Sequence, residues 1–71
     1  GQGRFVRMLA DRGALRPDLT VDAGIDITWT LCSLAVYDLL VLGRGWGDER
    51  YQAWLTDTLA QGLLADGAQG G

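Results

Sequence analysis

The sequence predicts an all-α fold of three helices: a short first helix, a long apolar second helix and an amphipathic third helix. Apolar residues recur at the i, i+3, i+4 spacing of helices, and no stretch shows convincing strand alternation. Glycine-containing turns at residues 13–17 and 43–47 separate the helical stretches. The last two helices are expected to pair as an antiparallel hairpin, which forms a four-helix bundle with a second copy of the chain.

The first helix is expected over residues 4–12. Its apolar residues fall on one face: Phe5, Met8 and Leu9. Gly13 supplies the left-handed residue that closes the helix, and Pro17 prevents its continuation. Because the helix is short and the chain opens on "GQGRF" without an initiator Met, residues 1–12 are expected to be the end of a preceding helix in a longer protein.

The second helix is expected to run from an N-cap at Thr20 to Leu42 and to stop at Gly43. Asp22 lies in its first turn, where it complements the positive end of the helix dipole. The helix would be roughly 33 Å long at 1.5 Å per residue.

The third helix begins near Gly47 or Asp48 and ends at Leu64. One side of it carries an amphipathic stripe: Tyr51, Trp54, Leu55, Thr58, Leu59 and Leu63. Residues 66–71 are small and polar, and are expected to be a disordered tail.

Apolar side chains surround almost the whole second helix. The polar remainder is thin: Asp26, Thr30, Ser33 and Asp38. A membrane span is not expected, because the apolar run is shorter than the ~20 residues a span needs and contains Asp38. Two short neighbouring helices would cover only part of its surface, so the helix is predicted to mediate oligomerisation.

Composition supports that prediction. The chain has 71 residues, of which 48% are hydrophobic, although a domain of this size buries only roughly 60% of its unfolded surface. Its net charge is −3 and it contains no Lys. An acidic chain of this kind is poorly suited to bind nucleic-acid phosphates, although residues 1–17 hold four Arg against one Asp. These arginines could contact RNA or form a solvated helix face. The solvated face is the favoured interpretation.

No catalytic constellation is predicted, and no metal or cofactor site. Asp22 and Asp26 lie four residues apart on a helix, but the chain has no His and no Lys to assist them. Cys32 has no His to generate a thiolate, so it is expected to be a small buried hydrophobe. For Trp29 and Tyr37, a place in the core and a place in the lining of a ligand pocket are equally favoured predictions.

The run "RGALRPDLTVDAGIDITWTLCSLAVYDLLVLGRGWGDERYQAWLTDTL", residues 12–59, resembles the C-terminal end of TetR-family transcriptional regulators. Members often show an "RGALRPGLT" turn, a "DILWALTSPEVYRLLV"-like helix, and a "RGWSPERYAAWLADTL"-like turn and final helix. The matching positions are Asp26, Ile27, Trp29, Leu31, Ser33, Tyr37, Leu39, Leu40 and Val41, followed by Arg44, Gly45, Trp46, Glu49, Arg50, Tyr51, Trp54 and Leu55. Leu34 and Ala35 replace a Pro-Glu pair, so no kink is expected there. Gly47 and Asp48 replace Ser-Pro, which weakens the helix N-cap.

The resemblance implies a bacterial, cytoplasmic repressor that binds DNA through an N-terminal helix-turn-helix missing from this chain. It also implies a homodimer and a small apolar effector, whose binding changes the spacing of the two DNA-reading heads. Residues 13–65 would then be the helical hairpin of the C-terminal regulatory and dimerisation domain.

Two sets of residues are assigned on this basis. The expected dimer interface is Leu31, Leu34, Val41, Leu55, Thr58, Leu59 and Leu63. The candidate lining of the effector pocket is Trp29, Cys32 and Tyr37. Two alternatives remain: a freestanding helical module that binds a different protein, and a fragment of an enzyme whose catalytic residues lie elsewhere. The chain itself is not expected to be an enzyme.

Overall fold

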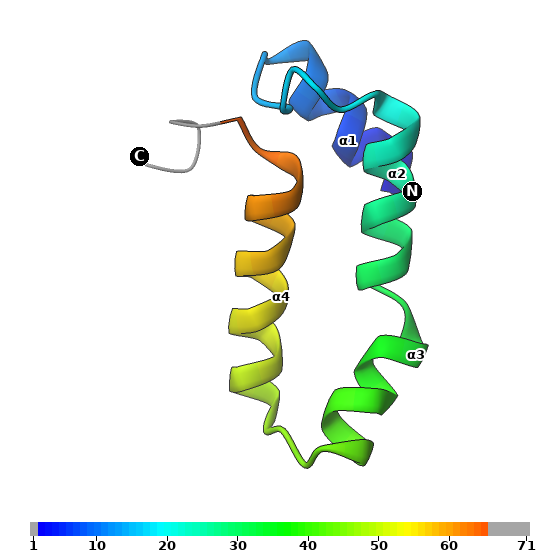
Figure 1. Ribbon diagram of the computed structural model, residues 1–71, viewed down its shortest axis with the longest axis vertical. Coiled ribbons are helices and arrows are strands. Elements are labelled where there is room, and N and C mark those ends of the chain that lie inside the picture. The colour runs from blue at the N-terminus through cyan, green and yellow to red at the C-terminus, as the bar shows by residue number, and fades with distance from the viewer. Residues whose placement is uncertain (1, 66–71) are drawn as a thin grey trace.

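The computed structural model describes residues 2–65, which form helices joined by short turns (Figure 1). The elements are α1 (Gln2–Asp11), α2 (Val21–Leu31), α3 (Leu34–Tyr37), the π-helix η1 (Asp38–Gly43) and α4 (Asp48–Leu63). The all-α class is confirmed. The prediction of three helices is wrong, because four α-helices occur in the described range. The tail predicted at residues 66–71 lies outside it.

The predicted second helix is broken in the middle. It does begin at its predicted N-cap, where the Thr20 hydroxyl accepts a hydrogen bond of 3.1 Å from the amide of Ala23. However, α2 ends at Leu31, and the segment from α3 to η1 is bent from it by 42°. The expectation of one continuous helix through Leu42, with no kink near Leu34, is therefore wrong.

Ser33 explains the break. Its backbone is extended, with φ −73° and ψ 150°, and its Oγ accepts a hydrogen bond of 3.3 Å from the amide of Val36. A serine at this position satisfies a free amide of the new helix and so competes with continuation of the old one. No proline is required to divide the helix when an N-cap residue lies at the junction.

The chain reverses after η1. The amides of Arg44 and Trp46 both donate to the carbonyl of Leu40, at 3.3 and 3.0 Å. Gly45 has a φ of 73°, a left-handed conformation that glycine adopts without steric cost. Gly47 is the N-cap of α4 and offers no side-chain hydrogen bond. α4 then runs back antiparallel to α2 (Figure 1).

A small core forms where α1, α2 and α4 meet. Val6 is fully buried, Leu9 is 8% exposed and Leu63 is 1% exposed. The predicted α1 face was partly wrong: Val6 was not included in it, whereas Phe5 and Met8 remain about 40% exposed. The register of α1 on α2 decides this, and helical spacing alone does not.

Gly24 permits the close approach of these helices. A methyl group at Gly24 would lie 2.9 Å from Cγ1 of Val6 and 3.5 Å from Cδ2 of Leu63. Nearby, the buried hydroxyl of Thr28 donates to the Gly24 carbonyl at 2.9 Å, which satisfies that polar side chain inside the core.

Backbone hydrogen bonds close the end of the molecule near α1. The Arg16 amide donates to the Leu63 carbonyl at 2.8 Å, and the Ala65 amide donates to the Ala14 carbonyl at 2.8 Å. Gly13, with a φ of 69°, ends the α1 turn as predicted. These bonds satisfy polar groups at the C-terminal end of α4, which would otherwise require water.

Aromatic rings join the other end of the hairpin. The rings of Tyr37 and Tyr51 meet edge to face with centroids 5.1 Å apart. Trp46 and Trp54 meet similarly at 6.0 Å, and the guanidinium of Arg50 lies 4.0 Å from the Trp46 ring centre. The predicted stripe of α4 is confirmed as its inward side: its residues are buried or half-buried, whereas residues 52, 53, 56, 57 and 61 between them are exposed.

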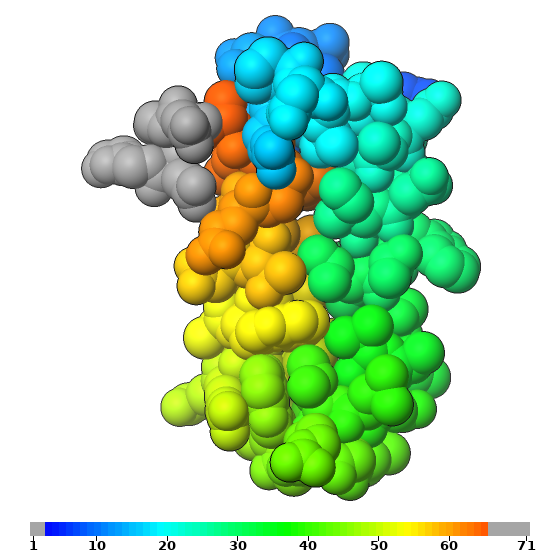
Figure 2. Space-filling view, in the orientation of Figure 1, coloured from blue at the N-terminus to red at the C-terminus, as the bar shows by residue number. Residues whose placement is uncertain are grey.

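The molecule is elongated, with dimensions of 36 × 24 × 18 Å. Its radius of gyration is 13.0 Å, against about 11 Å for a compact domain of this length. Side chains fill the space between the two long sides of the hairpin (Figure 2). A shape this narrow provides little interior, so much of the apolar side-chain area remains on the surface.

Candidate functional site

The most prominent surface feature lies along α3 and η1. Six exposed residues form what we call the outer face: Leu34, Ala35, Asp38, Leu39, Leu42 and Gly43. Its three leucines are 72%, 68% and 75% exposed, respectively. The intervening residues at 36, 37, 40 and 41 are half-buried. The outer face is therefore a mainly apolar side of the hairpin that the described part of the chain leaves uncovered.

Helix geometry explains this division. In the α-helical turn, residues four apart share a side, and in a π-helix the repeat lengthens toward five residues. Leu34 and Asp38 are four residues apart, and Leu42 and Gly43 follow Asp38 by four and five residues, so these exposed positions share one side. Tyr37 points to the opposite side, where its ring meets Tyr51. Residues 36, 37, 40 and 41 are therefore half-buried, and the leucines of the outer face stay about 70% exposed within the described chain.

An apolar groove runs between α1 and α4. It has a volume of about 360 Å³, and its walls are Phe5, Leu9, Thr56, Leu59, Ala60, Leu63 and Leu64. The sequence indicated the stripes on both helices, but no local pattern shows which stripe faces which. The groove was therefore missed as a site.

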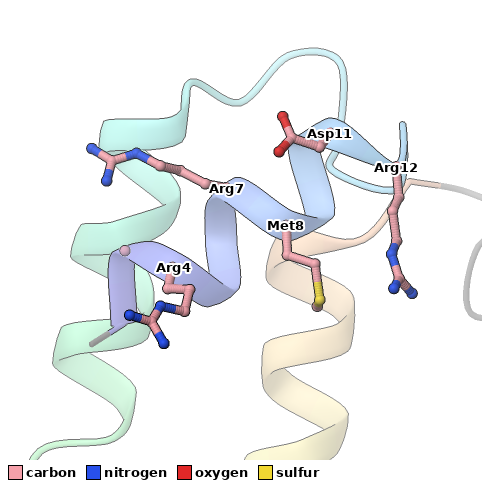
Figure 3. Close-up of a pocket in the computed structure, with 6 residues that line it drawn as sticks. Arg4, Arg7, Met8, Asp11 and Arg12 are labelled. Carbon is pink, nitrogen blue, oxygen red and sulfur yellow. The ribbon is translucent and has the colours of Figure 1, made fainter.

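A third feature is the arginine-bearing side of α1. Arg4, Arg7, Asp11 and Arg12 surround Met8 at a broad open hollow of about 780 Å³ (Figure 3). The guanidinium groups point in different directions and do not converge on one position (Figure 3). This arrangement is that of a solvated helix face and does not form a built anion site.

The three candidate effector-lining residues do not share a described cavity. Trp29 is 66% exposed, and Tyr37 packs against Tyr51. Cys32 is an exposed free thiol at the C-cap of α2, so the expectation that it is buried is wrong. The helix break places Cys32 at a junction, where no neighbouring helix covers it.

A further hollow of about 320 Å³ is lined by Asp26, Ile27, Thr30 and Leu31.

The residues expected at a dimer interface occupy three kinds of position. Leu34 is on the outer face, and Leu63 is instead a core residue of the chain itself. Leu31, Val41, Leu55, Thr58 and Leu59 are half-buried. Leu39 and Leu42, which were not among the residues expected at the interface, are among the most exposed large apolar side chains of the described range.

Over residues 2–65, no three His, Cys, Asp or Glu side chains gather closely enough to hold a metal ion. In the same range no single helix is long and apolar enough to cross a membrane. The bent pair formed by residues 21–31 and 34–43 reaches the required length and hydropathy only when taken together.

Comparison of the chain with protein-family models, with curated proteins and with solved structures found no match.

Proposed function

We propose that this chain is the C-terminal dimerisation region, with part of the ligand-binding region, of a TetR-like transcriptional repressor. The observation that carries the proposal is the outer face, where three leucines are about 70% exposed on a chain with only four buried apolar side chains in its described part. Soluble monomers rarely leave contiguous large apolar side chains uncovered, so such a face favours a protein partner. The resemblance of residues 12–59 to the end of TetR-family regulators supplies the biological setting.

In this proposal the partner is a second copy of the chain. DNA is bound only by an N-terminal head that lies outside these 71 residues, and a small apolar effector binds within the intact regulatory domain. The protein would act in the bacterial cytoplasm, where its operator is found. The chain by itself carries out no catalysis.

The second candidate is a helical module that binds a different protein. The same outer face supports it, because apolar exposure does not specify the partner. The two candidates differ in what the purified chain does alone: a homodimerisation region associates, whereas a module of the second kind stays monomeric or loosely packed until its partner is added.

Sedimentation equilibrium of the purified 71-residue chain, with circular dichroism recorded on the same samples, tests the proposal. A helical dimer over a wide concentration range is the expected result. A well-folded helical monomer at the highest attainable concentration would reject homodimerisation and leave the second candidate.

The regulator assignment has a separate test. The coding sequence upstream of residue 1 is expected to encode a helix-turn-helix, and the intact product is expected to bind DNA near its own gene. A nucleotide-binding or metal-binding motif in that position would instead identify an enzyme.

A further inference from the structure

We infer that two copies pair through their outer faces in an antiparallel arrangement about a twofold axis beside Val41, so that Asp38 of each copy lies opposite Arg44 of the other. The inference rests on the proposed homodimer and adds which surface forms it and in which register. It is carried by the charges and side-chain sizes along residues 38–44.

Asp38 is the only charged residue of the outer face, and it lies between exposed leucines. The one ion pair found among residues 2–65 joins Arg16 and Asp18, so Asp38 is not paired within the described chain. A carboxylate covered by a partner's apolar surface would lose hydration without compensation. A partner that covers this face therefore needs a cation opposite Asp38.

Arg44 can provide that cation. It is exposed, it is the C-cap of η1, and it forms no ion pair within residues 2–65. Asp38 lies three positions before Val41 and Arg44 three positions after it. In a twofold antiparallel pair, residues equally far from the axis on opposite sides face each other, so both copies form the same contact. A parallel pair would place the two Asp38 carboxylates next to each other.

Side-chain size agrees with the same register. Leu39 and Gly43 are each two positions from Val41, so the exposed leucine of one copy meets a residue without a side chain in the other. Space is open at Gly43, since an added methyl group there would meet only the Asp38 carbonyl, at 3.7 Å. Leu42, which is 75% exposed, lies one position from the axis, so the Leu42 side chains of the two copies are near each other on opposite sides of it.

Charge reversal tests the register. Asp38→Arg and Arg44→Asp each place like charges opposite one another at two symmetric positions. Each is expected to raise the dimer dissociation constant about tenfold or more in low-salt sedimentation equilibrium. Mixing the two variants in equal amounts pairs every new cation with an anion, so a heterodimer of near wild-type affinity is expected. The double variant Asp38→Arg/Arg44→Asp restores the pairs in a homodimer and should behave likewise.

Two exposed residues away from the outer face provide matched controls. Asp57→Arg on α4 and Arg12→Asp near the end of α1 change the net charge by the same amounts and should leave the dissociation constant within about threefold of wild type. If the wild-type chain dimerises but the single variants dimerise equally well, or the mixture does not recover, the register is wrong and the homodimer stands. A monomeric wild-type chain would overturn both.

Discussion

At the scale of single residues, Gly24 controls the packing of the core. It lies where Val6 of α1 and Leu63 of α4 both approach α2, and Val6 is fully buried. Real Cβ atoms essentially never approach another atom to 2.9 Å, so any side chain at this position must displace Val6. Gly24 has an ordinary helical backbone, so its conformational freedom is not the reason for a glycine here. Glycine is required because a side chain would not fit.

Gly24→Ala is therefore expected to destabilise the chain. Overpacking typically costs about 1–3 kcal/mol, of which the better helix propensity of alanine offsets up to about 1 kcal/mol. The control is Gly62→Ala, where the new methyl group would lie 3.7 Å from Ile27 in ordinary contact. That variant should gain about 0.5–1 kcal/mol. Urea unfolding followed by circular dichroism measures both, and equal effects of the two substitutions would contradict the packing argument.

At the scale of the elements, the break between α2 and α3 determines which side chains are exposed. Ser33 starts a new helix with its own hydroxyl, so Leu34 becomes the first helical residue of α3. The first residues of a helix do not donate to a preceding turn, and proline is well tolerated there. A Pro-Glu pair at these two positions would therefore fit the geometry that this chain reaches with Leu34 and Ala35.

Relative to Leu34→Ala, which also removes the outer-face leucine, Leu34→Pro is expected to leave the free energy of unfolding unchanged or to raise it by up to about 1 kcal/mol. Ser33 already has the extended backbone that a following proline prefers. Trp29→Pro, at an exposed position inside α2, should cost about 3 kcal/mol or more because it removes a helical hydrogen bond. Thermal unfolding at one fixed protein concentration distinguishes them. A loss at Leu34 as large as that at Trp29 would mean that the helix is continuous.

At the scale of the whole molecule, the chain has more apolar surface than a narrow hairpin can bury. Only Val6, Leu9, Tyr51 and Leu63 are buried apolar residues in the described range, whereas the leucines of the outer face are exposed. Folding and association are expected to be linked in such a chain, since the second copy covers what the first cannot.

The melting temperature should consequently depend on protein concentration. For a dimer, a tenfold rise in protein concentration adds about 1.4 kcal/mol to the free energy of unfolding. For a dimer of two such chains this raises the melting temperature by about 3–6 °C. Leu42→Asp, on a side chain that is 75% exposed, should abolish this dependence and leave a helical monomer. A wild-type melting temperature that is constant over two decades of concentration would show that the outer face does not associate.

Much of the fold could be predicted because it depends on neighbours in the sequence. The helical spacing, the Thr20 N-cap, the left-handed Gly13 and the inward stripe of α4 are all short-range features. Each follows from the chemistry of a few consecutive residues, and the structure agrees with each of these predictions. The break at Ser33 was missed although its signal was present, because apolar residues on both sides favoured continuation more visibly than one N-cap residue favoured an end.

The candidate surfaces depended on choices that the sequence alone did not determine. An apolar residue in a sequence indicates that burial of its side chain is favourable, but it does not indicate which neighbour will cover that side chain. The packing of α1 on α2 selected Val6 over Phe5, and the packing of the hairpin leaves Leu39 and Leu42 exposed while Leu63 lies in the core. The sequence by itself determined an all-α chain with more apolar surface than it can bury. Only the tertiary structure decided where the uncovered apolar surface lies. A helix that turns about its axis changes which of its residues are buried, and the local sequence does not show which orientation has the lower free energy.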